Sequence, residues 1–476
     1  MVSLKTVSHS GLSRLLDIKR HMCKPSIRIV FIIFSKNYQN VILLLYKCAI
    51  HFTMENSMKL LQVQVFFRHG ARTPLFHVKS PIFPEALWTP EISTDLPHTL
   101  FPYCLIDIST QKQVQLSPDY LDKLFILPGG NRVGELTKGG QQDAFNLGTR
   151  LKKQYKENSN FLPYKFQPSQ FYLRTTFIAR TIKSLRCVMA GLYGDNISLT
   201  EPVNFECEKL NTEILFPNPH TCELLLQLFN DGVTECCKSK TFQEMKQKLK
   251  EILGVEKLLD CVEQRSTDYD CPIYFVRDDY LARKYAGFPI PNELEKLLPE
   301  MHKICSEELL HEFLGKREDW KKNVHIVLSD LFSLILNNMI NYKKLPQFHL
   351  YACHDSSIML LLFGLNIFDG IWPPFAADII FELYTTSTTS TTSSSTSTSS
   401  SELSSMKSFP LHSYDSSLID DNLDHLWFRI IYLGKPLLLR SLWNISDSYS
   451  QHLNDHSFIP FKVLYKYIDK AKNGIE

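Results

Sequence analysis

Residues 61–74 read LQVQVFFRHGARTP. Apolar and polar residues alternate in the first half of this stretch, which predicts a β-strand with Leu61, Val63, Val65 and Phe67 on one face. Within a few residues of its end, the strand presents a histidine flanked by two arginines. That arrangement suits a nucleophile aimed at an anion, most plausibly a phosphate, because guanidinium groups match phosphate oxygens bidentately.

Two more predicted strands end in residues of the same kind. Gln170–Leu173 is followed by Arg174, and Phe348–Ala352 is followed, after a cysteine, by His354 and Asp355. A helical pattern comes after each of them, so strands and helices alternate along the chain and predict an α/β fold. Ligands of open α/β sheets bind beyond the carboxyl ends of the strands. If these strands are neighbours, the residues that follow them meet in one site.

The rest of the chain predicts one domain, residues 59–476, with a largely helical insertion. The core of the domain comprises residues 59–194 and 321–476, and the insertion covers about 195–320. Residues 76–135 show little periodicity and predict a long irregular loop. Thr385–Ser405 is almost pure serine and threonine, cannot bury a core, and is expected to be disordered.

The composition is that of an ordinary globular protein: 476 residues, 44% hydrophobic and 21% charged. The net charge of +2 gives no global field that would attract nucleic acid, so any anion site must be a local cluster. The twelve cysteines include no CxxC pair, which argues against a zinc site and against a compact disulfide scaffold.

Residues 1–58 differ from the rest of the chain. Residues 1–54 hold eight Lys or Arg and one acid, and their apolar patches are too short to span a bilayer. This composition favours a mitochondrial transit peptide. The alternatives are a translation start placed upstream of the true one, at Met54 or Met58, and an uncleaved signal anchor. Two glycosylation sequons, at Asn196 and Asn444, matter only if the protein is secreted or membrane-anchored.

Together, the three strand ends supply what phosphoryl transfer requires. A neutral imidazole is a competent nucleophile, arginines stabilise charge on phosphate oxygens, and a carboxyl can protonate the leaving alkoxide and later activate water. Arginines in this role make a divalent cation unnecessary, and neither a cofactor nor a metal site is expected. Each residue taken singly has an ordinary explanation, and Arg174 by itself fits a surface ion pair best. The combination is what favours a site.

The run from Arg68 to Pro74 resembles the signature of the histidine acid phosphatases, a branch of the histidine phosphatase superfamily, and His354-Asp355 matches the second motif of that branch. The similarity covers about residues 60–384 and resumes more weakly at 426–435. It implies a mixed, mostly parallel sheet flanked by helices, with a helical cap. It also implies a phosphate-accepting nucleophile, His69, a proton donor, Asp355, and phosphate-binding side chains, Arg68, Arg72, Arg174 and His354.

The expected activity is hydrolysis of phosphate monoesters through a phosphohistidine, most plausibly of lysophosphatidic acid to monoacylglycerol and phosphate. We expect a monomer that makes at most peripheral contact with membranes. The loop 76–135 contains aromatic residues that either line an acyl channel or simply pack the loop: Phe76, Phe83, Trp88, Phe101 and Tyr103.

Two alternatives stay open. A phytase-like or inositol-polyphosphate phosphatase would need more basic residues near the site than the insertion supplies, since its lysines at 238–250 have the spacing of a solvated helix face. A non-catalytic, phospholipid-binding pseudophosphatase is disfavoured by the complete set of six site residues.

Overall fold

The computed structural model describes residues 58–117, 124–194, 202–258, 262–263, 272–386, 423–439 and 457–472, which belong to one compact unit. The N-terminal segment before Met58, the Ser/Thr tract from residue 387 onward and both sequons lie outside these residues.

The described strands form a ten-stranded mixed sheet in the order β11-β10-β9-β1-β8-β5-β6-β3-β4, with β12 paired to β10. The parallel centre consists of β1 (Met58–Arg68), β8 (Phe348–Cys353), β5 (Phe171–Thr176), β6 (Val203–Glu208) and β3 (Tyr103–Asp107). Antiparallel strands extend both sides: β4 (Gln113–Val114), β9 (Asp378–Thr386), β10 (Leu426–Tyr432), β11 (Lys435–Pro436) and β12 (Phe458–Pro460). The predicted mixed sheet with a mostly parallel centre is confirmed.

Strand β1 is buried on both faces. Val63, Val65 and Phe67 pack together in one core, as the alternation predicts. Leu61 was expected on the same face, but it packs against the opposite core. The reason is a β-bulge: the pairing of β1 with β9 shifts register across Leu61, and an extra residue reverses the alternation.

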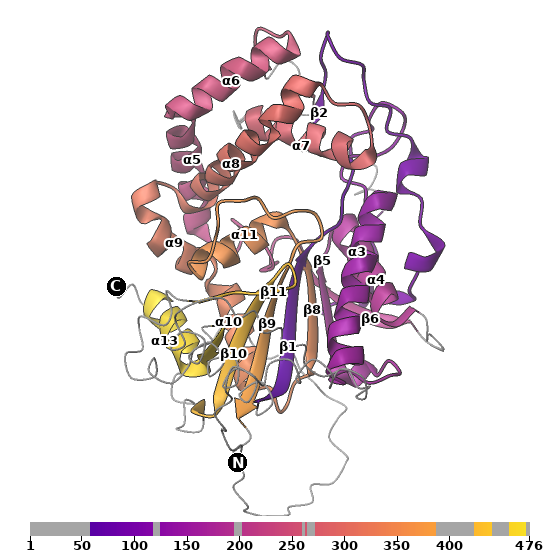
Figure 1. The fold of residues 1–476 in the computed structure, drawn as a ribbon, viewed down its shortest axis with the longest axis vertical. Coiled ribbons are helices and arrows are strands. Elements are labelled where there is room, and N and C mark those ends of the chain that lie inside the picture. The colour runs from indigo at the N-terminus through magenta and orange to yellow at the C-terminus, as the bar shows by residue number, and fades with distance from the viewer. Residues whose placement is uncertain are drawn as a thin grey trace, which may run out of the picture. The chain divides into compact units, whose positions relative to one another are not determined.

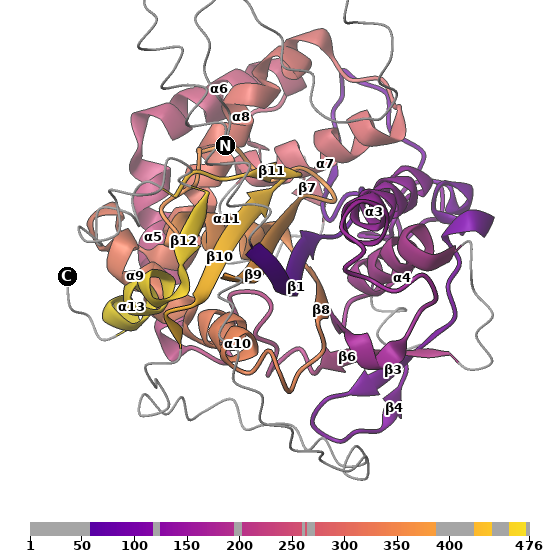
Figure 2. The ribbon, with the colours of Figure 1, turned by 60° about the horizontal axis from the view of Figure 1, so that its bottom comes forward.

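Helices cover both faces of the sheet (Figure 2). On one face lie α3 (Lys138–Leu151), continued by a π-helical turn (Lys152–Asn158), and α4 (Ala179–Tyr193). Thr137 caps α3 as predicted, since its hydroxyl oxygen accepts a hydrogen bond from the Gly140 amide. The other core receives side chains from α10 (Ser329–Ile340), α11 (Asp355–Gly364) and α13 (Phe461–Lys472).

A helical cap lies above the carboxyl ends of the central strands in Figure 1. It consists of α5 (Glu223–Lys238), α6 (Lys240–Leu253), α7 (Pro272–Ala286) and α8 (Asn292–Leu314), and α9 (Trp320–Val327) leads back to the core. Strand β6 falls within the range predicted for the insertion but pairs with β5, so the helical part begins only at α5. A two-stranded sheet of β2 (His77–Val78) and β7 (Val262–Glu263) ties the loop after β1 to the cap.

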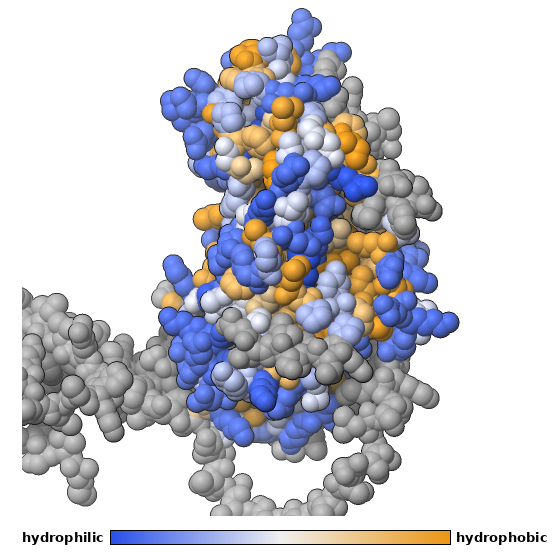
Figure 3. All heavy atoms as spheres, turned by 90° about the vertical axis from the view of Figure 1, so that its right-hand side faces the viewer, coloured by the Kyte–Doolittle hydropathy of each residue, from blue (hydrophilic) through white to orange (hydrophobic). Residues whose placement is uncertain are grey.

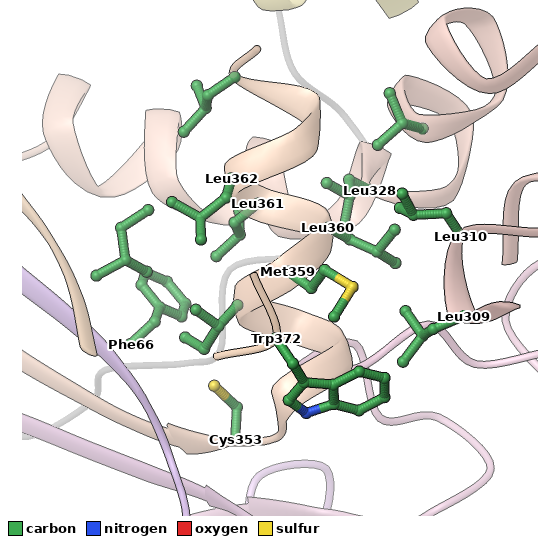
Figure 4. Close-up of a cluster of buried hydrophobic side chains, with 14 of the residues drawn as sticks. Phe66, Leu309, Leu310, Leu328, Cys353, Met359, Leu360, Leu361, Leu362 and Trp372 are labelled. Carbon is green, nitrogen blue, oxygen red and sulfur yellow. The ribbon is translucent and has the colours of Figure 1, made fainter. Parts of the chain in front are cut away.

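Helix α11 runs through the larger core. Figure 4 shows Met359–Leu362 packed among Phe66 from β1, Leu309 and Leu310 from α8, and Trp372. This packing fixes the start of the helix, where Asp355 stands. Among the residues that the structure describes, no single helix is long and apolar enough to cross a membrane, and only the bent pair 317–327 and 329–340 meets that test jointly.

Candidate active site

The three predicted strand ends belong to adjacent strands, because β8 lies between β1 and β5. The register pairs Arg68 with Cys353, and the amide of His69 donates to the Cys353 carbonyl over 3.1 Å. As a result, the ring centroids of His69 and His354 are 5.7 Å apart. Two histidines separated by 285 positions in the sequence therefore share one site.

The tautomer of His69 follows from its hydrogen bond. Its Nδ1 lies 2.9 Å from the carbonyl oxygen of Gly70. A carbonyl can only accept, so Nδ1 carries the proton and Nε2 keeps the lone pair. Burial, followed by the charges of Arg180, Arg68 and Arg72, lowers the pKa of His69 well below its usual value. The imidazole therefore stays neutral, with a free lone pair, in acidic solution.

The turn that carries His69 packs directly on the start of α3. A Cβ atom on Gly70 would lie 2.1 Å from the carbonyl oxygen of Gly140, so this position has room only for glycine. From the other side, the amide of Gly70 donates to the hydroxyl of Ser184 in α4 over 3.0 Å. Contacts of the Gly70 backbone with two helices thus hold His69 in place.

Arg68 is fully engaged on one side of the site. Its Nη2 lies 2.8 Å from Oδ2 of Asp355, and its Nη1 donates to the Pro373 carbonyl over 2.7 Å. Its guanidinium lies 4.1 Å from the ring centroid of Phe375. Burial, together with Arg72 and other nearby charges, lowers the pKa of Arg68 to about 10, which leaves it charged.

Arg72 is held by the cap. Its Nη1 and Nη2 donate to the two carboxylate oxygens of Asp278 on α7, over 3.2 and 2.7 Å. The same carboxylate accepts from the Leu75 amide over 2.7 Å. The Nε atoms of Arg68 and Arg72 are buried and have no hydrogen-bond partner among the described residues. Both donors are therefore available to a ligand oxygen.

Arg174 does not join this group, which corrects the sequence-based assignment. Strand β5 does not end at Arg174 but continues to Thr176. The Nη2 of Arg174 donates over 2.8 Å to Glu213, and both side chains are buried. The Glu213 oxygen also accepts from the amides of Ile214 and Leu215. Arg174 is therefore half of an internal ion pair that fixes the segment after β6.

Arg180, and not Arg174, is the arginine of this segment whose charge acts on the site histidines. It lies in the first turn of α4, and among charged groups it has the largest effect on both site histidines. Burial first, and Arg180 next, lower the pKa of His354 to about 3. The run from Arg174 to Arg180 contains two arginines, and only knowledge of where β5 ends could have separated them.

His354 is a neutral hydrogen-bond donor. Its Nε2 lies 3.1 Å from the hydroxyl of Thr176, which lies 2.8 Å from the hydroxyl of Thr181. Thr181 gives its proton to the backbone carbonyl of Thr176 or Ile178, so Thr176 must donate to Thr181. The remaining contact then requires a proton on Nε2 of His354.

Asp355 is ionised in this arrangement. Its Oδ2 accepts from Arg68 and, over 3.1 Å, from Nε1 of Trp372, and its Oδ1 accepts from the Ser356 amide. Burial raises its pKa, but the positive charges of Arg68 and Arg72 outweigh burial and hold the pKa well below the usual value.

Helix α7 supplies residues that the sequence did not single out. Besides Asp278 it carries Arg277, 1% exposed, with its guanidinium 4.0 Å from the ring centroid of Trp372. The charged side chains named here are four arginines and two aspartates: Arg68, Arg72, Arg180, Arg277, Asp278 and Asp355. Positive charge is in excess, which suits a bound anion such as phosphate. Within the described residues, no group of three or more His, Cys, Asp or Glu is placed to hold a metal ion.

A family model described as the histidine phosphatase superfamily (branch 2) matches residues 59–400. The chain belongs to this superfamily. Human lysophosphatidic acid phosphatase type 6 is 31% identical over 334 residues, which cover 69% of this chain and 74% of that protein. Human prostatic acid phosphatase is 24% identical over 264 residues, or 53% and 65% of the two chains. This histidine phosphatase is accordingly a phosphomonoester hydrolase.

Solved structures of other proteins also align with the chain. The phytase of Citrobacter braakii is 14% identical, with a TM-score of 0.49, and the alignment covers 87% of this chain and 98% of the phytase.

Proposed function

We propose that this histidine phosphatase hydrolyses lysophosphatidic acid to monoacylglycerol and phosphate through a phosphohistidine on His69. The observation that carries the mechanism is the tautomer: Nδ1 is tied to the Gly70 carbonyl, which leaves the Nε2 lone pair to attack. Arg68, Arg72 and Arg180 surround this atom with the positive charge that a phosphoryl group requires.

The proposed reaction has two steps. Nε2 of His69 forms a bond to phosphorus as the bond to the alcohol oxygen breaks, and that oxygen takes a proton from Asp355. Water then attacks phosphorus, Asp355 takes a proton from the water, and the P–N bond returns its electron pair to His69. When phosphate binds, one of its oxygens replaces the Thr176 hydroxyl as the acceptor of the His354 Nε2 proton.

The state of Asp355 suggests where the first proton comes from. Because its pKa is held low by Arg68 and Arg72, the carboxylate is not protonated until the substrate binds. A phosphate monoester has a second pKa of about 6, so in acidic solution it arrives carrying a proton. The negative charge of the bound ester offsets Arg68 and Arg72, which raises the pKa of Asp355 and lets the carboxylate take that proton. Asp355 is then a neutral carboxylic acid, and the ester is a dianion bound to the arginines.

The site is bordered by apolar surface that suits an acyl chain. Ile371, next to Trp372, is 63% exposed, and Tyr285 is 43% exposed, with its ring 4.9 Å from that of Phe375. Of the loop aromatics that were expected either to line an acyl channel or to pack the loop, Trp88 and Phe101 belong to buried cores. We place the chain over Ile371 and Tyr285, and the 31%-identical relative named for lysophosphatidic acid supports this substrate.

The phytase-like alternative is not better supported. The lysines of the insertion make surface ion pairs with glutamates, as Lys240 does with Glu244 and Lys248 with Glu300. The charges of Lys240 and Lys248 are thus balanced by neighbouring glutamates on the exposed faces of the cap helices. They do not supply the cluster that several phosphates would require.

Phosphate release and covalent trapping test the proposal together. The full chain should release phosphate from lysophosphatidic acid faster than from phytate, and a rapid quench should trap acid-labile phosphate on the protein. His69→Ala should abolish both turnover and the trapped label without unfolding the protein. Label retained in this variant rejects His69 as the nucleophile, and a preference for phytate rejects the substrate.

We also propose peripheral membrane contact and a mitochondrial destination. Large apolar side chains, among them Leu87, Leu100 and Ile126, are more than half exposed. Figure 3 shows hydrophobic patches between hydrophilic ones on the side that carries α3 and α4. Co-flotation with vesicles, weakened in Leu87→Ser/Ile126→Ser, tests the first proposal. Import of a reporter fused to residues 1–58 tests the second.

A further inference from the structure

Arg277 differs from other buried arginines of this protein. Arg72, Arg174 and Arg283 each face a carboxylate, and so does Arg429. Among the described residues, Arg277 makes one hydrogen bond, from its Nε to Nδ1 of His302 over 2.8 Å. Burial lowers the pKa of His302 to about 3, so that partner is neutral.

The Nη2 of Arg277 is buried and has no hydrogen-bond partner among the described residues. A buried guanidinium without a counter-ion or a full set of acceptors is costly, and it is usually kept because something else completes it. The neighbouring aromatic rings do not complete it: the Trp372 ring covers one face of the guanidinium, and a π face leaves the edge donors free.

The position of Arg277 indicates which part of a substrate it meets. Trp372 donates from Nε1 to Oδ2 of Asp355, and Arg277 packs on the face of the same indole. Asp355 must stand beside the leaving oxygen, on the side of phosphorus opposite His69, because displacement is in line. The groups beyond Asp355, namely Trp372 and Arg277, therefore lie next to the alcohol and not next to the phosphate.

From this geometry we infer that Arg277 determines leaving-group specificity by binding an acceptor oxygen on the alcohol, a few bonds from the scissile oxygen. The inference rests on the proposed function for the direction of attack. Suitable acceptors are a glycerol hydroxyl, an ester carbonyl or a second anionic group. A plain alkyl phosphate offers none of them.

Four esters and three variants on one helix test this assignment. The probes are propyl phosphate, which lacks an acceptor, glycerol 3-phosphate, 3-phosphoglycerate with its carboxylate, and lysophosphatidic acid. The variants of the full chain are Arg277→Met and, as a matched control on α7, Lys284→Met, whose lysine makes an exposed ion pair with Glu295. Arg277→Lys keeps the charge without the planar fork.

Arg277→Met should lower kcat/KM for the oxygenated esters by roughly 10–100-fold, the value of a hydrogen bond to a charged group. For propyl phosphate the loss should stay below about threefold, and Lys284→Met should change nothing. Arg277→Lys should recover only part of the loss. The ester that loses most identifies the acceptor as neutral or anionic.

An equal loss on all four esters in a folded variant would overturn the inference and make Arg277 part of the phosphate clamp. No loss on any ester would reduce it to a packing residue. If Arg277→Met fails to fold, Arg277→Lys gives the same comparison. The two proposals can fail separately. If no phosphohistidine is trapped, the proposed function fails, but the ratio of kcat/KM for glycerol 3-phosphate to kcat/KM for propyl phosphate can still be measured and still tests Arg277.

Discussion

Arg174 and Arg180 lie six positions apart, and the structure predicts opposite consequences when each is replaced by methionine. Arg180→Met should lower kcat/KM strongly and leave stability comparatively intact, because Arg180 bears on both site histidines. Arg174→Met should do the reverse, because its partner Glu213 is fully buried.

The magnitudes follow from the environment of each residue. Without Arg174, the Glu213 carboxylate keeps only the amides of Ile214 and Leu215, and its second oxygen has no partner among the described residues. Breaking a buried pair on one side costs about 3–5 kcal/mol. That is a large part of the roughly 5–15 kcal/mol that stabilises a typical domain. Removing one charge-stabilising donor costs about 3–4 kcal/mol of transition-state stabilisation, or roughly 10²–10³ in rate.

Denaturant unfolding and steady-state kinetics on the same preparations separate the two effects. Replacing both partners, in Arg174→Met/Glu213→Leu, should recover most of the lost stability, since no uncompensated charge remains. The reasoning is refuted if folded Arg174→Met loses a hundredfold in kcat/KM while Arg180→Met stays near the wild type.

Three more outcomes are expected. Asp355→Asn should slow phosphoenzyme formation from lysophosphatidic acid ~10²–10⁴-fold in a single turnover. The same step with a nitrophenyl ester should be slowed much less, because its leaving group needs no proton. Equal defects with both substrates would reject Asp355 as the general acid. Burial lowers the pKa of His349 to about 4, so the folded protein keeps this histidine neutral while the unfolded chain protonates it below pH 6.5. The free energy of unfolding should therefore fall by about 2 kcal/mol by pH 5. Denaturant unfolding above pH 6.5 and at pH 5 should show a smaller fall in His349→Gln, and an equal fall would contradict this. Joining Thr386 to Leu423 by a short turn should leave activity and melting temperature nearly unchanged, because the Thr386 amide already bonds the His425 carbonyl and closure cost grows only logarithmically; a collapse in solubility would contradict this.

Local sequence patterns were sufficient for much of the fold and for bringing most of the predicted site residues together. The alternation in β1 and the motifs after β1 and β8 placed Arg68, His69, Arg72, His354 and Asp355, because parallel neighbours bring their carboxyl ends together. The exact end of a strand is harder to predict, since it depends on pairing with other strands. Because the end of β5 was not predicted correctly, Arg174 was assigned to the site in place of Arg180. Because of the bulge in β1, Leu61 was assigned to the wrong face of the strand, while the other predicted residues of that face were correct.

The contribution of α7 had no local signal. Asp278 lies 206 positions from Arg72, and nothing in the helical pattern of Pro272–Ala286 distinguishes a carboxylate that binds an arginine from one that faces water. Strand β6 was hidden for a related reason, because it stands between long helices and joins the sheet only through pairing with β3 and β5. Both features are set by packing between distant segments.

The residue proposed to contact the alcohol lies on a cap helix, α7, whereas the residues proposed to bind phosphate follow the central strands. This separation affects how such enzymes diversify. A lineage can exchange Arg277 and accept a new alcohol while the histidines and their arginines stay under unchanged selection. Asp278 sets the boundary of that freedom, because it holds Arg72 and any drift there would disturb the chemistry itself. New substrates should therefore arise through few mutations, clustered on one face of one helix, and should rarely pass through inactive intermediates.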